Sequence, residues 1–377
     1  MGIDAWGFDA ERQVLARRFR TRRCRLAALR SGVLLAFLVA LFTGGSAALQ
    51  GWTGGLALPS WAQAAVFVAV LYAAGSVLSL PFAYVSAFRW EVEAGLSTTT
   101  ARAWLADHGK ALALGLGATV VAGDVVLWLL AHVPSWWWLA AWAFGVVFGF
   151  AVGVLAPVLL VPLFFRSRPV RDAALSARIE ALAKSAGVPI VGVYELGASA
   201  KTRRSNAGVM GHGRTRRIVV TDTLLADYAR EEVDAVLAHE LGHERFRDPV
   251  TGFAYTALSS LLVAAVVGVL YASAFRTFGL ASFAEPSALP VIALLGGLAS
   301  AATGPPDLWW SRRRERRADR FALDVTRDPV SFARMIAKLH DKNLGVAHAK
   351  PWEIWLFYSH PPGRERVELA RSFGASR

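Results

Sequence analysis

Cysteine and charged residues are both scarce in this chain of 377 residues. Cys24 is its only cysteine, which excludes an internal disulfide and a metal site built from several thiolates. Charged residues make up 18% of the chain and hydrophobic residues 55%, whereas about 25% of a soluble globular domain is charged. So little charge predicts a mostly α-helical, polytopic membrane protein.

The charge that is present is unbalanced, with a formal net charge of +13 at pH 7. Nucleic-acid-binding proteins can be equally basic, but the chain has no basic patch with interleaved aromatic residues, as in the known nucleic-acid modules. The basic residues instead cluster beside apolar runs, as they do on the cytoplasmic side of membrane proteins. We therefore expect the lipid bilayer as a partner, and no nucleic acid.

Apolar runs long enough to cross a bilayer, with Asp124 as the one charged residue within them, predict six spans. Four lie in a membrane domain of residues 31–165, at 31–49, 61–88, 111–133 and 136–165, and two form a hairpin in residues 251–304, at 252–275 and 289–304. The fourth run exceeds one straight span, so a tilted helix kinked near Pro157 and Pro162 is expected. The sixth span is expected to end at Pro305-Pro306. Small residues at 46–48 also fit a signal-peptide cleavage site. The basic stretch of thirty residues that precedes the first apolar run instead favours an uncleaved first span.

The motif that carries chemistry is His-Glu-Leu-Gly-His at residues 239–243. It lies in a polar segment, residues 166–250, that is expected to form a helix (172–186), strands (190–196 and 217–221) and a helix bearing the motif. On that helix His239 and His243 lie one turn apart on one face, so both can bind a single metal ion. Glu240 lies one residue round, where its carboxylate can act as a base. A zinc hydrolase needs this set of groups, although a solvated helix with two histidines is the simpler alternative.

A third ligand is expected from the run Arg-Arg-Arg-Glu-Arg-Arg-Ala-Asp at residues 312–319. Glu315 stands there among five arginines, and Asp319 follows four residues later on the same helix face. Alone, the run reads as a salt-bridged basic helix just inside the membrane. Because a hairpin of two spans returns the chain to the side of the histidine motif, we favour Glu315 as the third ligand. Asp319 would then accept the free N–H of a ligating histidine.

The basic residues also predict an orientation in the membrane. The loops 50–60, 134–135 and 276–288 contain one basic residue, Arg276, whereas residues 1–30 alone contain eight arginines. By the positive-inside rule, both termini and the histidine motif face the cytoplasm. Residues 1–30 form a basic cytoplasmic N-terminus, 166–250 the first part of a catalytic domain, and 305–377 its C-terminal part with the third ligand.

Together these residues resemble the type I CAAX prenyl endopeptidases, integral-membrane zinc proteases that process the yeast a-factor precursor and prelamin A. The likeness runs from about Pro81 to the C-terminus. The matching positions are a connector (Pro81, Phe88, Glu91, Gly95, Thr100, Asp107, Lys110), a strand region (205–207, Gly211, 217–219, 222–225), the histidine motif, Ser311-Arg312 with Glu315 and Ala318-Asp319, residues 342–345, and Ser359-His360-Pro361-Pro362 with Arg366.

The resemblance implies a helical membrane barrel around a chamber, capped by a small α+β zinc metalloprotease domain. It implies one zinc ion per chain, held by His239, His243 and Glu315, with Glu240 as the general base. Asn206 and His360 would contact the substrate backbone and the tetrahedral intermediate, and Arg366 would serve a structural or substrate-side role. The implied substrate is a peptide or protein, with a prenylated C-terminus or a membrane protein as the candidates.

The chain departs from this family at three points. The pocket edge from Gly208 to Gly213, which includes His212, is smaller than usual. The family has seven spans, whereas this sequence predicts six, and Glu244 follows the histidine motif where an aromatic residue is common. Two other functions remain open. A heat-shock-type membrane protease shares the histidine motif and the downstream Glu but lacks the connector and the Ser-His-Pro-Pro ending. A transporter or scaffold with a structural zinc would need a fourth protein ligand.

Overall fold

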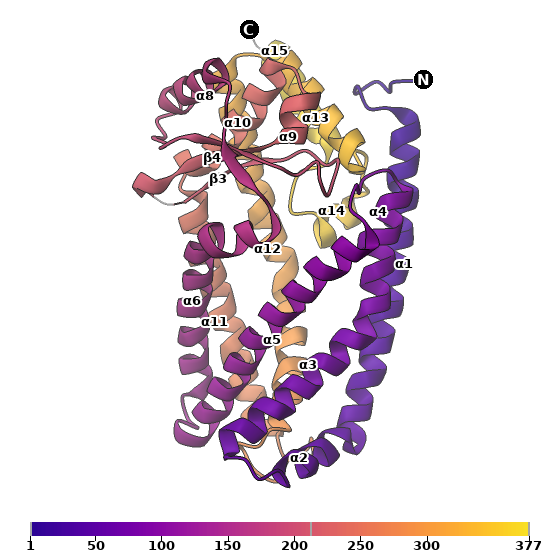
Figure 1. The fold of residues 1–377 in the computed structure, drawn as a ribbon, viewed down its shortest axis with the longest axis vertical. Helices are drawn as coiled ribbons and strands as arrows, with labels where there is room; N and C mark the ends of the chain where they lie inside the picture. The colour runs from indigo at the N-terminus through magenta and orange to yellow at the C-terminus, as the bar shows by residue number, and fades with distance from the viewer. Residues whose placement is uncertain (1, 212, 376–377) are drawn as a thin grey trace.

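A bundle of long helices stands beneath a small sheet and its flanking helices (Figure 1). The computed structural model describes residues 2–211 and 213–375. The bundle is formed by α1 (Ala10–Ala40), η1 (Leu41–Gly45), α2 (Ser46–Gly54), α3 (Ser60–Tyr84), η2 (Val85–Arg89), α4 (Trp90–Glu93), α5 (Ala101–His132), α6 (Trp137–Leu155), η3 (Ala156–Leu160), α7 (Val161–Phe164), α11 (Asp248–Ala274) and α12 (Ala288–Thr326). The remaining elements are β1 (Ser167–Pro169), α8 (Ala173–Ser185), β2 (Val193–Leu196), β3 (Ala207–Met210), η4 (Gly213–Thr215), β4 (Arg217–Thr221), α9 (Asp222–Asp227), α10 (Arg230–Arg245), α13 (Pro329–Asn343), α14 (Pro351–Phe357) and α15 (Gly363–Ala375).

The mostly helical, polytopic membrane fold predicted from composition is confirmed. Within the described residues, six helical stretches are long and apolar enough to cross a membrane, and each corresponds to one predicted span. Many of their large apolar side chains are exposed, among them Leu35, Val147 and Leu262, as expected for surfaces that face lipid. A π-helical segment, η3, interrupts the fourth stretch at the predicted position of the kink. The N-terminal end of α1 and helix α15 both lie at the end of the bundle that carries the sheet (Figure 1).

The predicted end of the sixth span at Pro305-Pro306 is wrong. Helix α12 continues through both prolines to Thr326, so one helix of 39 residues connects the far end of the bundle with the sheet end. Proline removes a backbone donor, but packing can hold such a helix together, and α12 packs along both α10 and α11. The helix expected at residues 312–322 is therefore the last part of a membrane helix.

The sheet has four strands in the order β1-β2-β4-β3. Strands β2 and β4 pair in parallel and confirm the two predicted strands, whereas β1 and β3 add antiparallel at the two edges and were not predicted. Both are short, and β3 contains Gly208, so neither has a strong strand pattern. Helix α8 begins after Asp172, whose side chain accepts hydrogen bonds from Ala174 N and Leu175 N.

The core under the sheet joins segments that are far apart in the sequence. Ile218 of β4, Leu237 and Leu241 of α10, and Ile336 of α13 are fully buried there. Phe8, which precedes α1, is also fully buried in this core. Its burial attaches the first membrane helix to the domain that carries the histidine motif. A second core at the opposite end of the bundle contains Leu130, Trp137 and Tyr271.

The contribution of Phe8 can be tested by substitution. Truncating a fully buried phenylalanine removes apolar contacts and leaves a cavity, at a cost of about 3–5 kcal/mol. We expect Phe8→Ala to lower the thermal midpoint of the purified protein, measured by tryptophan fluorescence. Ile3→Ala is the matched control, because Ile3 is 72% exposed, and it should leave the midpoint unchanged. Equal midpoints for both variants would contradict the attachment.

Candidate metal centre

Helix α10 presents His239 and His243 to α12 because its other face is fixed in the core. Leu237 and Leu241 are fully buried, and the side chain of Glu232 accepts a hydrogen bond from Ala229 N at the start of the helix. Gly242 of the motif allows α12 to approach closely, since a Cβ at this position would lie 3.2 Å from Cα of Ala318. The crossing of the two helices therefore favours glycine, because a larger residue would press against Ala318 and Phe321.

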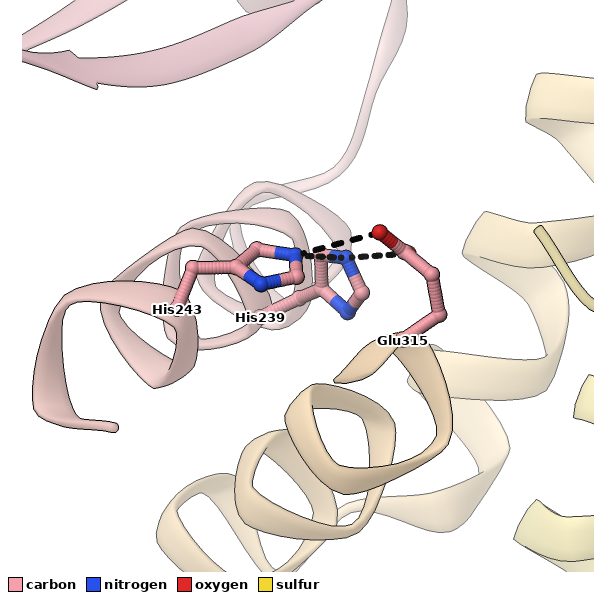
Figure 2. A group of neighbouring side chains, drawn as sticks. All are labelled: His239, His243 and Glu315. Atoms are coloured by element: carbon pink, nitrogen blue, oxygen red, sulfur yellow. Dashed lines mark hydrogen bonds and ion pairs between the residues drawn. The ribbon is translucent and has the colours of Figure 1, made fainter. Parts of the chain in front are cut away.

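Three predicted residues converge where these helices cross (Figure 2). The Nε2 atoms of His239 and His243 lie 3.2 Å apart. Glu315 Oε2 lies 3.3 Å from Nε2 of His239, and Oε1 lies 3.5 Å from Nε2 of His243. Ligands of a tetrahedral zinc ion, at roughly 2.0–2.1 Å from the metal, are about 3.3 Å apart. The spacing of the three side chains fits such a metal.

The hydrogen bonds of the two histidines also fit a cation. Nδ1 of His239 lies 2.9 Å from Asp319 Oδ1, and Nδ1 of His243 lies 2.8 Å from Asp248 Oδ2. A carboxylate accepts from an N–H, so in each neutral ring Nε2 carries a lone pair and points at the other electron donors. Glu315 Oε2 is buried and has no hydrogen-bond donor among the described residues. A divalent metal ion satisfies all three groups at once.

The pKa of His239 also indicates that the cluster is suited to a cation. Burial alone would lower the pKa of His239, but the adjacent carboxylates of Asp319 and Glu315 raise it to about 9. The two buried carboxylates therefore keep the imidazole of His239 protonated, and so positively charged, at neutral pH. A metal ion supplies that charge in place of the proton.

Each of the two carboxylates behind the histidines is held by an arginine. Arg366 donates to both oxygens of the fully buried Asp319, from Nη2 to Oδ1 at 2.5 Å and from Nε to Oδ2 at 2.9 Å. Arg317 forms an ion pair with Asp248 through one oxygen, Oδ1, whereas Oδ2 faces His243. Asp319 thus lies where the sequence predicted it, and Arg366 lies behind it.

Asp248 was not predicted from the sequence. It follows His243 by five residues and is brought back to it by a turn at Arg247, which has a φ of 57°. Directly before Pro249, at the start of a membrane helix, an acid is typical of a residue that initiates the helix. Nothing in the sequence indicates that its carboxylate also contacts His243. Only the turn reveals that its carboxylate faces the histidine.

A pocket of about 280 Å³ adjoins the metal centre and is lined by Glu240, Asn206 and His360. Burial raises the pKa of Glu240 above its ordinary value, which strengthens it as a base. The amide oxygen of Asn206 accepts from Ala207 N at 3.0 Å, so its NH₂ group is left for the pocket. Ser359 Oγ lies 2.8 Å from Nδ1 of His360, and Nε2 of that histidine lies 3.5 Å from Glu315 Oε1.

Strand β3 begins beside Asn206 and is the edge of the sheet. Among the described residues it pairs on one side, with β4, so its other side is open to an added strand. The pocket therefore combines an acid, two side-chain donors and a free main-chain edge. Glu244, the departure after the motif, faces elsewhere and accepts from Arg216 Nε at 2.6 Å.

Arg312 belongs to the family resemblance in the sequence, but no role was predicted for it. It is 4% exposed and lies on α12 one turn before Glu315. Its Nη1 donates to Tyr358 O at 2.6 Å and to Ile354 O at 2.9 Å, at the end of α14 and just before His360. In the sequence it is one of five arginines on the two sides of Glu315, and nothing there indicates which of them fixes a neighbouring segment. The guanidinium fastens the segment that bears His360 to the helix that bears Glu315.

Comparisons with known proteins agree with this architecture. Residues 169–373 match peptidase family M48, and residues 8–166 match a family described as CAAX prenyl protease N-terminal, five membrane helices. CAAX prenyl protease 1 of Saccharomyces cerevisiae is 30% identical over 329 residues, covering 81% of this chain and 71% of the yeast protein. The metalloprotease YhfN of Bacillus subtilis is 28% identical over 339 residues, covering 89% and 79%. The crystal structure of S. mikatae Ste24p superposes with a TM-score of 0.87 at 24% identity, over 98% of this chain and 91% of that one.

Metal binding should depend on pH in a defined direction. Because the pKa of His239 is raised to about 9, the metal-free cluster holds a proton at neutral pH that the metal must displace. The apparent metal affinity should therefore rise as pH increases from 6 toward about 9, with roughly one proton released per metal ion. Titration calorimetry in buffers of different ionisation enthalpy measures both quantities.

Asp319→Asn is the informative variant in this experiment. It removes the charge that raises the pKa of His239, so the pH dependence should flatten, and the metal affinity should fall by about 10–100-fold. An affinity that does not change with pH in the unsubstituted protein would contradict this electrostatic description.

Arg312→Lys should loosen the segment that carries His360. The ammonium of the shorter lysine side chain does not reach the position of Nη1, the single atom that donates to both carbonyl oxygens. Losing these charged hydrogen bonds should accelerate amide hydrogen exchange of residues 354–360 by roughly tenfold, while the exchange of α12 stays unchanged. Arg313→Lys is the control, because Arg313 instead lies over the ring of Trp309. Identical exchange in both variants would refute the fastening role.

Proposed function

This chain belongs to peptidase family M48 and carries the membrane region of the CAAX prenyl proteases, and from this we propose that it is a zinc-dependent endopeptidase. It is a multi-pass integral membrane metalloprotease, and its family implies a divalent metal. We propose that this metal is one zinc ion per chain, held by His239, His243 and Glu315. The observation that carries the proposal is the convergence of these three side chains beside a pocket that contains Glu240.

The residues of the pocket support a hydrolytic sequence. A bound zinc ion supplies Lewis acidity and lowers the pKa of water toward about 7. Glu240 takes the proton from the attacking water, whose oxygen forms a bond to the carbonyl carbon of the peptide. Glu240 then delivers that proton to the amide nitrogen as the carbon–nitrogen bond breaks. The products are a carboxylic acid and an amine, so atoms and protons balance.

Asn206 and His360 would stabilise the substrate in this sequence. The free NH₂ of Asn206 can donate to a main-chain carbonyl of a peptide that adds to the edge of β3. When the hydroxyl of Ser359 donates to Nδ1 of His360, the proton of the neutral ring lies on Nε2, where it can be donated to the developing oxyanion. Such a donor is worth about 3 kcal/mol of transition-state stabilisation. Arg366 acts indirectly in this scheme. It holds Asp319, which in turn accepts from Nδ1 of His239.

We propose a C-terminally prenylated peptide as the substrate class, as in the proteins whose names include CAAX prenyl protease. The support is that the N-terminal membrane region also matches that group, so the resemblance is not limited to the zinc-binding motif. Quality-control proteolysis of damaged membrane proteins is the alternative, and a comparison of two substrates distinguishes the two functions.

We also propose that both termini and the metal centre face the cytoplasm. The loops at the opposite end, residues 55–59, 133–136 and 275–287, contain Arg276 as their only basic residue. The arginines of residues 12–30 and 312–320 lie instead at the end of the bundle with the metal centre. This charge distribution supports a cytoplasmic site by the positive-inside rule.

Glu240→Gln should lower the rate of cleavage of a farnesylated C-terminal peptide by about 10²–10⁴-fold, because the amide cannot accept the proton of water. The variant should retain its metal, since Glu240 is not placed among the ligands. Glu244→Gln changes a neighbouring acid of the same helix, bound to Arg216, and should leave the rate within a few fold. Wild-type turnover by the Glu240 variant would contradict the assignment.

Unfolded casein assayed beside the farnesylated peptide tests the substrate class. We expect the peptide to be cleaved with the higher kcat/KM, and a chelator to abolish both reactions. Preferential cleavage of casein would instead support the quality-control function, and no cleavage of either substrate would favour a non-enzymatic protein with a structural zinc.

A further inference from the structure

A cleft of about 690 Å³ lies between α1 and α3, apart from the substrate pocket. Its walls include apolar residues of both membrane helices, and its rim carries four arginines. The apolar residues are Leu26, Ala27, Phe82, Ala83 and Ala87, and the arginines are Arg20, Arg23, Arg30 and Arg204. The cleft thus combines apolar walls with basic side chains, and Arg30 lies at the start of the uncharged part of α1.

The cleft lies at the level where a bilayer changes from hydrocarbon to head groups. Helix α1 is rich in arginine up to Arg30 and uncharged from residue 31 onward. Helix α3 and the following η2 are uncharged from residue 60 until Arg89. Both helices therefore leave the apolar layer beside the cleft, and its arginines lie where lipid phosphates are found.

The positive charge of the cleft is only partly compensated by the protein. Arg204 donates to Glu91 Oε1 at 2.9 Å and Oε2 at 3.0 Å, and the same carboxylate lies 3.5 Å from Arg23. One acid is thus shared between two arginines, and the side chain of Arg23 is 46% exposed. Arg30 is exposed and has no ion pair or hydrogen bond within the part of the chain that the structure describes. Arg20 is occupied by contacts to Tyr358 and Glu353.

We propose that this cleft binds an anionic phospholipid, with the phosphate between Arg23 and Arg30 on the face of α1 that includes Ala27, and the acyl chains against Phe82 and Ala83 of α3. The arginines provide charge-assisted donors for the phosphate. The apolar walls distinguish a lipid from a free phosphate, which would leave them without a partner. This inference does not depend on the proposed proteolytic function.

A lipid bound in the cleft would lie close to the metal centre. Asn343 lines both this cleft and the pocket beside Glu240, and Tyr358 lines the cleft two residues before His360. A lipid taken up from the surrounding membrane would therefore contact a residue that also forms a wall of the substrate pocket.

Native mass spectrometry of the full-length protein, released from detergent after incubation with phosphatidylglycerol or phosphatidylcholine, tests the proposal. The unsubstituted protein should retain one phosphatidylglycerol in preference to phosphatidylcholine. Arg23→Gln with Arg30→Gln should weaken this retention by roughly tenfold or more. Arg18→Gln with Arg25→Gln is the matched control, because it removes the same charge from the same helix at positions that do not line the cleft. It should retain the lipid within about twofold.

A second variant tests the shape of the site without changing its charge. Ala27→Trp places a large side chain in the cleft and should also reduce retention, whereas glycerol 3-phosphate should not displace the lipid. Equal loss in the two double variants would show a diffuse attraction to the basic helix and overturn the proposal. Unchanged retention in Arg23→Gln with Arg30→Gln, or displacement by glycerol 3-phosphate, would overturn it as well.

Discussion

The close crossing of α10 and α12 is the contact on which the site depends. At Gly242 and Ala318 the helix backbones approach so closely that a Cβ on the glycine would lie 3.2 Å from Cα of Ala318. This approach places Glu315 within 3.3 Å of His239, although the two residues are far apart in the sequence. Because α12 begins at the opposite end of the bundle, the helix that supplies the carboxylate is also a membrane helix. The metal centre is therefore fixed directly to the membrane domain.

Charge alternates outward from this crossing. The metal position is surrounded by two imidazoles and a carboxylate, the imidazoles by Asp319 and Asp248, and these acids by Arg366 and Arg317. In a buried site each of these charges would be costly alone, and each is stabilised by the next. The arrangement fixes the tautomer of both histidines and directs their Nε2 atoms at the same point. Of the five arginines around Glu315, Arg317 takes part in this arrangement through its ion pair with Asp248.

Local patterns in the sequence were sufficient to predict part of the fold and of the site. The apolar runs predicted all six spans, and the spacing of His239 and His243 placed both on one helix face. Glu315 and Asp319 could be proposed because the membrane hairpin returns the chain to the same side. Asp248, Arg312 and the continuation of α12 through its prolines could not be predicted, because each depends on a turn or on packing between distant segments. A single sequence carries no local signal for such contacts.

The central claim is that three side chains form an open metal site for hydrolysis. X-ray absorption spectroscopy at the zinc edge, on the purified zinc-loaded protein, measures the ligand set directly. We expect two imidazole ligands from His239 and His243, oxygen ligands that include Glu315, and no sulfur. After the substitution Glu315→Gln, both imidazoles should remain while the oxygen shell changes. A third imidazole, a sulfur ligand, or a spectrum unaffected by Glu315→Gln would contradict the site.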